Sequence, residues 1–187
     1  LDIIIKHKLS EVAESKKNRP IQNLVATAKK KSDKSRFIEC LLSTQRKNLP
    51  ALIAECKKGS PSRDIIVKNY DPVEIAEIYQ THKASAISVL TDSKFFYGKK
   101  EHIQQIKEVV SLPILRKDFI IDSYQIPETK ALGADCILLI AACLSKKQIK
   151  DFLLESSDYG LDALIEVHTE KELENVLSLD HKLIGIN

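Results

Sequence analysis

Short apolar runs alternate with helical segments along this chain from about residue 50 onward. The runs are three to five residues long and are bounded by turn-forming or charged residues: Leu52–Cys56, Ala86–Leu90, Pro113–Leu115, Cys136–Ile140, Ala163–Val167 and Leu183–Ile186. Runs that are apolar on both faces are typical of parallel strands that helices cover. The succession therefore predicts an α/β fold with six parallel strands, which fits a doubly wound sheet or most of an eight-stranded barrel.

The segments between these runs begin with residues that cap helices. Asp71 stands directly before Pro72 and three residues before Glu74, as an N-cap does before a first helical turn. Three further pairs have the same spacing: Asp122 with Gln125, Ser145 with Gln148, and Thr169 with Glu172. Gly133 and Gly160 stand where two of the helices should end.

Residues 1–50 follow a different pattern and are expected to form an N-terminal helical extension of one domain that covers residues 1–187. Ile5, Leu9 and Val12 form an apolar helical stripe, and Pro20 opens a second helix. The run Lys29–Arg36 is polar and basic. It is interpreted as a solvated loop rather than a nucleic-acid patch, because no aromatic residue interleaves it for base stacking.

Composition and charge exclude several classes of protein. A net charge of +3 is too weak to indicate nucleic acid by itself. No apolar run approaches the roughly 18 residues that would span a bilayer. The 4 cysteines form no C-x-x-C pair and are interpreted as reduced thiols of a cytoplasmic protein. The glycine-rich nucleotide-binding motifs are absent from the sequence.

Four charged residues stand inside or at the ends of the apolar runs: Glu55, Lys57, Lys117 and Glu166. Buried strands rarely carry charge unless it is paired, and in parallel α/β folds function collects at the carboxyl ends of the strands. Two lysines and two carboxylates that met there could perform general acid–base chemistry on an anionic substrate. From the residues alone, structural ion pairs at the rim of the sheet are an equally open interpretation.

Several stretches resemble the indole-3-glycerol-phosphate synthase family, in the order in which that family has them. They are Ile53–Ser62, Ala86–Asp92, Leu115–Asp122, Leu164–Val167 and Ile184–Asn187, together with the opening residues Leu1–Ile4. The resemblance covers essentially the whole chain. It implies a TIM (β/α)8 barrel with an N-terminal helical extension, here expected to lack strands seven and eight because the chain stops where the sixth strand ends.

The resemblance also implies an activity, that of a carboxy-lyase in tryptophan biosynthesis. The substrate would be 1-(2-carboxyphenylamino)-1-deoxyribulose 5-phosphate, and the product indole-3-glycerol phosphate, with no cofactor or metal. Lys117 resembles the general acid that protonates the ketone, and Glu166 the carboxylate that moves a proton during rearomatisation. Lys57 matches a lysine that contacts the substrate, and Glu55 the carboxylate that holds this lysine. The expected substrate-binding residues are Ser60 at the phosphate, Asn187 in the pocket and Phe96 in the loop over the aromatic ring.

The sequence departs from the family pattern at three positions besides its length. Gly59 stands where a larger residue is usual, and Asp64 and Asp180 stand where a glycine is usual. Aspartate tolerates the left-handed conformation better than most residues, so the exchange of glycine for aspartate is expected to be benign.

The end of the chain at Asn187 leads us to expect a fragment of a longer enzyme. Two other functions stay open at this point. One is another phosphate-binding TIM-barrel enzyme of the same pathway, such as phosphoribosylanthranilate isomerase. The other is an inactive fragment that associates through open sheet edges. The expected partner is a phosphorylated small molecule, with no nucleic acid and no membrane, and the expected state is a monomer or homodimer.

Overall fold

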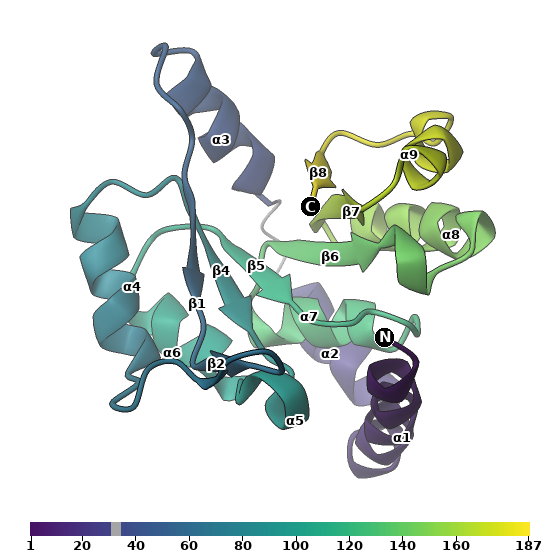
Figure 1. Cartoon of the computed structure of the whole chain (residues 1–187). Coiled ribbons are helices and arrows are strands. Elements are labelled where there is room, and N and C mark those ends of the chain that lie inside the picture. The colour runs from purple at the N-terminus through teal and green to yellow at the C-terminus, as the bar shows by residue number, and fades with distance from the viewer. Residues whose placement is uncertain (31–34) are drawn as a thin grey trace. The chain divides into compact units, whose positions relative to one another are not determined.

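The computed structural model describes residues 1–30 and 35–187, and the chain divides into two compact units. Unit 1 comprises residues 1–34, 119–131 and 137–187, and unit 2 comprises residues 35–118 and 132–136. Each unit has a hydrophobic core of its own. Most elements of both are labelled in Figure 1.

Unit 2 is built on three parallel strands in the order β1 (Ile53–Cys56), β4 (Ala86–Leu90) and β5 (Ile114–Lys117). A short antiparallel hairpin of β2 (Gly59–Ser60) and β3 (Asp64–Ile65) follows β1. The helices of this unit are α3 (Phe37–Gln45), α4 (Pro72–Thr81), α5 (Ser93–Phe96) and α6 (Glu101–Val109).

The two faces of the unit 2 sheet differ in what they contact. Cys56, Val89 and Ile114 lie on one face and are buried against residues of α4 and α6. Successive side chains of a strand point to opposite faces. Glu55 on β1 and Lys117 on β5 therefore lie on the other face, away from these two helices.

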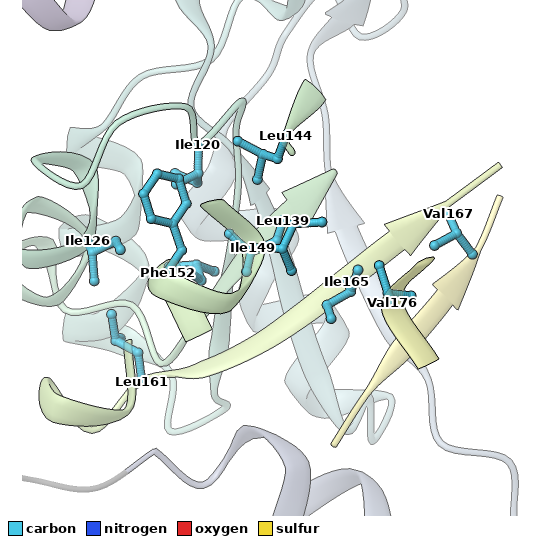
Figure 2. Close-up of a cluster of buried hydrophobic side chains, with 11 residues drawn as sticks. Ile120, Ile126, Leu139, Leu144, Ile149, Phe152, Leu161, Ile165, Val167 and Val176 are labelled. Carbon is cyan, nitrogen blue, oxygen red and sulfur yellow. The ribbon is translucent and has the colours of Figure 1, made fainter. Parts of the chain in front are cut away.

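Unit 1 contains the N-terminal helices and the last strands. Its elements are α1 (Asp2–Asn18), α2 (Ile21–Lys30), most of α7 (Gln125–Leu132), most of β6 (Cys136–Ile140), the 3-10 turn η1 (Ala141–Cys143), α8 (Lys146–Asp158), β7 (Asp162–Val167), α9 (Glu170–Leu177) and β8 (Ile184–Ile186). The strand order is β6-β7-β8, and β8 runs parallel to β7. Figure 2 shows how side chains from α7, β6, α8, β7 and α9 gather into the core of this unit.

The predicted strands and caps are confirmed. All six apolar runs form strands. The Asp71 side chain accepts hydrogen bonds from the first turn of α4, and Ser145 and Gln148 form a reciprocal capping box at α8. Gly133 and Gly160 end their helices with φ values of 96° and 62°, a conformation that glycine adopts at little cost.

One local expectation is wrong, and two elements were not predicted. Helix α2 continues to Lys30, so the start of the predicted loop Lys29–Arg36 is helical, while residues 31–34 of that run lie outside the described residues. Helix α3 and the β2–β3 hairpin carry no signal that we recognised. Asp64 does adopt the left-handed conformation, with φ 52°, but Asp180 does not.

Among the residues that the structure describes, no helix combines the length and apolar character needed to cross a membrane. The prediction of a single domain, with residues 1–50 as its extension, stays a prediction.

Candidate active site

Glu55 and Lys57 form an ion pair at the carboxyl end of β1. The Lys57 Nζ lies 2.6 Å from the Glu55 Oε1, and each side chain is about one-third exposed, at 37% and 32%. The Tyr79 hydroxyl on α4 donates a hydrogen bond of 2.9 Å to the Glu55 carbonyl oxygen, which anchors the strand at this point. The pair therefore presents a solvent-accessible ammonium group at the end of a fixed strand.

Lys117 ends β5, and its two neighbours along the chain belong to a buried polar network. Its neighbours Arg116 and Asp118 are fully buried as side chains and are joined by an ion pair of 3.2 Å. Thr91 donates to the same Asp118 oxygen at 2.6 Å, and its backbone N–H donates to the Lys117 carbonyl at 3.2 Å. Because both flanking residues are fixed, the backbone that carries Lys117 has little freedom to move.

Cys56, between Glu55 and Lys57, belongs to the other face of β1. Burial first, and the negative charge of Glu55 second, raise the pKa of its thiol to about 12. The thiol therefore stays protonated near neutral pH, and since the thiolate is the reactive form, Cys56 serves packing rather than chemistry.

The loops after β1 and β4 carry the other two residues expected in unit 2. Ser60 lies in β2, where its Oγ is 3.3 Å from the Oγ of Ser62. Phe96 is the last residue of α5, and Asp92 caps this helix by accepting a 2.7 Å hydrogen bond from the Phe95 N–H. Unit 2 thus gathers Glu55, Lys57, Ser60, Phe96 and Lys117 on β1, β5 and the loops that follow β1 and β4.

Glu166 and Asn187 meet at the carboxyl ends of β7 and β8 in unit 1. The Asn187 amide donates a 3.2 Å hydrogen bond to the Glu166 Oε1, and the Glu166 side chain is 12% exposed. The Asn187 backbone N–H also donates to the Val167 carbonyl at 3.0 Å, which extends the pairing of the two strands. The structure therefore brings together the two residues that the sequence predicted for this unit.

His168 is a member of this group that the sequence analysis did not include. Its Nε2 lies 3.4 Å from the Glu166 Oε1 and 3.3 Å from the Asn187 Nδ2. The Glu172 carboxylate on α9 accepts a 2.7 Å hydrogen bond from its backbone N–H. The sequence feature that could have identified His168 is its two-residue spacing from Glu166, which places both side chains on one side of an extended strand.

The two units offer different chemistry at their strand ends. Unit 2 supplies ammonium groups, which can donate protons and attract anions. Unit 1 supplies a carboxylate with an imidazole and an amide beside it, which can accept and hold a proton. Within the described ranges 1–30 and 35–187, no group of three His, Cys, Asp or Glu side chains is placed to hold a metal ion.

A sequence model of the family described as Indole-3-glycerol phosphate synthase matches residues 1–187. A protein of that name from Legionella pneumophila (strain Paris) is 47% identical over 187 residues, which is 100% of this chain and 70% of the relative. Another, from Chlorobium chlorochromatii (strain CaD3), is 44% identical over 187 residues, 100% of this chain and 72% of the relative. The chain thus spans about seven-tenths of the length of these relatives.

A similar solved structure is tryptophan synthase subunit alpha from Legionella pneumophila str. Paris. It superposes with a TM-score of 0.56 at 12% sequence identity, covering 82% of this chain and 68% of that chain. At such low identity the likeness concerns the fold alone. It confirms the predicted α/β fold of the TIM-barrel type.

Proposed function

Because this chain belongs to the indole-3-glycerol phosphate synthase family, we propose that it carries out that carboxy-lyase reaction with the charged residues at its strand ends. The acid steps fall to Lys117 and Lys57, and the base step falls to Glu166. The substrate is a phosphorylated small molecule, 1-(2-carboxyphenylamino)-1-deoxyribulose 5-phosphate.

The first step needs an acid. A carbon–carbon bond forms between the ring carbon that bears the carboxylate and the ketone carbon of the sugar. The ketone oxygen gains negative charge as the bond forms and takes a proton from the Lys117 ammonium. The ring carbon then releases its carboxyl group as carbon dioxide, and the electrons of the broken bond return to the ring.

The remaining steps need a second acid and a base. The new hydroxyl group leaves as water after taking a proton from Lys57, and the nitrogen lone pair replaces the electrons of the broken carbon–oxygen bond. Glu166 then removes a proton from the carbon that lies between the nitrogen and the former ketone carbon, which completes the indole. Each proton lost by a lysine has to be regained before the next turnover, and the proton taken by Glu166 has to be released.

One observation carries this proposal: Glu55, Lys57 and Lys117 belong to strand ends on the sheet face that the α4 and α6 core does not cover. A lysine paired with a carboxylate at 2.6 Å is held in one place. Ser60 and Phe96 on the adjoining loops are proposed to contact the phosphate and the aromatic ring, and Asn187 to line the pocket beside Glu166.

Indole fluorescence during turnover of the carboxyphenylamino substrate tests the proposal. The chain has no tryptophan, so its own background is low. Lys117→Ala is expected to lower kcat by about 10²- to 10⁴-fold, the usual contribution of a positioned general acid. Lys147→Ala is the matched control, since this lysine is 87% exposed and should leave turnover unchanged. Equal turnover in the Lys117 variant and the unchanged chain would refute the assignment.

Titration calorimetry with indole-3-glycerol phosphate gives a second readout that needs no turnover. The unchanged chain is expected to bind the product, and Lys57→Met should weaken this binding by removing a cation near the phosphate. A cytoplasmic location and a monomeric or homodimeric state are further proposals, which subcellular fractionation and analytical ultracentrifugation would test.

A further inference from the structure

The hairpin after β1 and the short helix after β4 are joined by a side-chain hydrogen bond. The Tyr97 hydroxyl, at the end of α5, donates to the Asp64 Oδ1 in β3. Both residues have positive φ values, 57° and 52°, which non-glycine residues rarely adopt. Each of the two side chains in this hydrogen bond is thus placed by an unusual backbone conformation.

The backbone around this hydrogen bond leaves no room for a side chain at residue 59. A Cβ atom at Gly59 would collide with the Asp64 carbonyl oxygen and lie 2.7 Å from the Tyr97 ring. The clash with the carbonyl is with backbone, so no change of side-chain rotamer would relieve it. The hairpin therefore closes on itself and lies directly against the Tyr97 ring only because residue 59 has no side chain.

The Tyr97 side of the contact is fixed to the end of β4. The Asp92 carbonyl accepts a 2.8 Å hydrogen bond from the Gly98 N–H. A Cβ at Gly98 would collide with the Leu90 carbonyl oxygen, so the turn after α5 lies against the strand. Leu90 is in register with Lys117 on β5. The turn that carries Tyr97 is therefore tied to the strand next to the proposed acid.

The hairpin side is fixed to the end of β1. The Lys58 carbonyl accepts hydrogen bonds from the Ile66 and Val67 N–H groups, at 2.9 and 3.1 Å. This closes the base of the hairpin one residue after Lys57. Between the two fixed bases, the Tyr97–Asp64 bond is the side-chain link that joins the loop of Ser60 to the helix of Phe96.

We infer that Asp64 and Tyr97 are positioning residues: their hydrogen bond holds the Ser60 hairpin and the Phe96 helix together as one rim beside Lys57, and so presets the loops that receive a phosphorylated aromatic substrate. What the rim receives rests on the proposed function. The Tyr97–Asp64 hydrogen bond, called the clasp below, rests on contacts within unit 2 alone. The bond to Asp64 is also the first cause that raises the pKa of the Tyr97 hydroxyl, so this group stays a donor at neutral pH.

Limited proteolysis tests the clasp without any substrate. Arg63 is exposed at the tip of the hairpin, and trypsin cuts after arginine once the loop can open. Tyr97→Phe and Asp64→Gly should each speed cleavage after Arg63 by about threefold to tenfold, the range that one lost hydrogen bond implies. Tyr97→Phe is the sharper variant, because it removes only the donor hydroxyl and leaves the residues on both sides of the Arg63–Asp64 bond unchanged.

Conservative variants separate the clasp from general loosening. Asp64→Asn keeps an acceptor oxygen and tolerates the left-handed backbone, so its cleavage should stay within twofold of the unchanged chain. The double variant Tyr97→Phe/Asp64→Gly should be cut no faster than the faster single variant, since both remove the same bond. Tyr159→Phe, at the end of α8 in unit 1, is the control that loses a tyrosine hydroxyl elsewhere and should not change cleavage.

Substrate kinetics test the positioning role. Tyr97→Phe and Asp64→Gly should raise KM several-fold with kcat within about twofold, and Asp64→Asn should restore KM. If the unchanged chain shows no turnover, the Kd of indole-3-glycerol phosphate takes the place of KM. Unchanged cleavage in Tyr97→Phe would overturn the clasp. Faster cleavage with KM and Kd both unchanged would overturn the positioning role. Absence of both turnover and product binding in every protein, the unchanged chain included, with cleavage as expected, would count against the proposed function and leave the clasp standing.

Discussion

The two units hold their strand-end residues by different means. In unit 2, Lys117 lies between Arg116 and Asp118, which form a fully buried ion pair. In unit 1, the Glu166 Oε1 accepts a 3.2 Å hydrogen bond from the Asn187 amide and lies 3.4 Å from the His168 Nε2, and both of these neighbouring side chains are exposed. The backbone that carries Lys117 is thus fixed by buried side chains, while the Glu166 carboxylate is contacted by exposed ones. Changes near Lys117 should therefore cost stability, and changes near Glu166 should cost activity alone.

The largest effect on stability should follow from breaking the buried pair. Arg116→Leu removes the cation and leaves the Asp118 carboxylate buried without it, which in comparable pairs costs about 3–5 kcal/mol. Urea unfolding followed by far-UV circular dichroism measures the loss. Arg46→Ala is the control, because its ion pair with Glu39 is 66% and 60% exposed and should be worth under about 1 kcal/mol. Equal losses in the two variants would mean that the buried Arg116–Asp118 pair stabilises unit 2 no more than an exposed pair does.

The next effect concerns the base side, where activity should fall and stability should not. Glu166→Gln keeps an oxygen that can accept from the Asn187 amide but cannot take a proton. We expect kcat to drop about 10²-fold or more, with the urea midpoint unchanged. Glu174→Gln, on the exposed part of α9, is the matched control. A shifted midpoint in Glu166→Gln would show that this carboxylate is structural and would weaken the contrast between the units.

A smaller effect is expected from His168, which touches both Glu166 and Asn187. His168→Asn removes the imidazole from the Glu166 Oε1 and should lower kcat/KM severalfold, because a neighbour that orients the carboxylate is lost. Asn187→Ala removes another such neighbour. If the two residues act on Glu166 together, the fold loss of kcat/KM in the double variant will be smaller than the product of the two single losses. Steady-state kinetics on the unchanged chain, the two single variants and the double variant would show this. Strictly multiplicative effects would contradict this.

The sequence predicted the framework well because local rules decide it. Apolar runs, caps and helix-ending glycines are short-range signals, and the strands from Ile53 to Ile186 follow them. The N-terminal stripe shows where such rules stop. Leu9 belongs to the apolar stripe of the sequence, but it is 56% exposed, while Lys8 is fully buried and pairs with Glu11 at 2.8 Å. Which face of a helix is buried depends on what packs against it, and periodicity does not encode that.

The site residues divide in the same way. Glu55 and Lys57 could be assigned to one face from the two-residue period of a strand, and the structure pairs them. The Tyr97–Asp64 contact joins residues 33 positions apart through two left-handed turns, and no spacing rule reaches that far. His168 lies between these cases, since its spacing from Glu166 was visible but its contact with Asn187 depends on the pairing of β7 with β8.

The smallest expected effect concerns the pH dependence of stability and compares two histidines, one in each unit. His168 of unit 1 is 40% exposed as a side chain, whereas His102 of unit 2 is buried in α6 beside the Tyr70 ring, at a centroid distance of 5.7 Å. Burial first, and the charge of Lys99 second, lower the pKa of His102. The unfolded chain therefore binds a proton at His102 more readily than the folded chain does. The stability that the neutral His102 contributes is complete above its ordinary pKa of about 6.5 and is lost as the pH falls below that value.

The measurement compares urea midpoints at pH 7.5 and pH 5.5. His102→Gln should reduce the drop in midpoint between these two values, because glutamine does not titrate. His168→Gln is the comparison variant in unit 1, where the imidazole is 40% exposed. If His168→Gln reduced the drop in midpoint as much as His102→Gln, protonation would destabilise unit 1 as much as unit 2. The different means by which the two units hold their side chains would then have no consequence for acid stability.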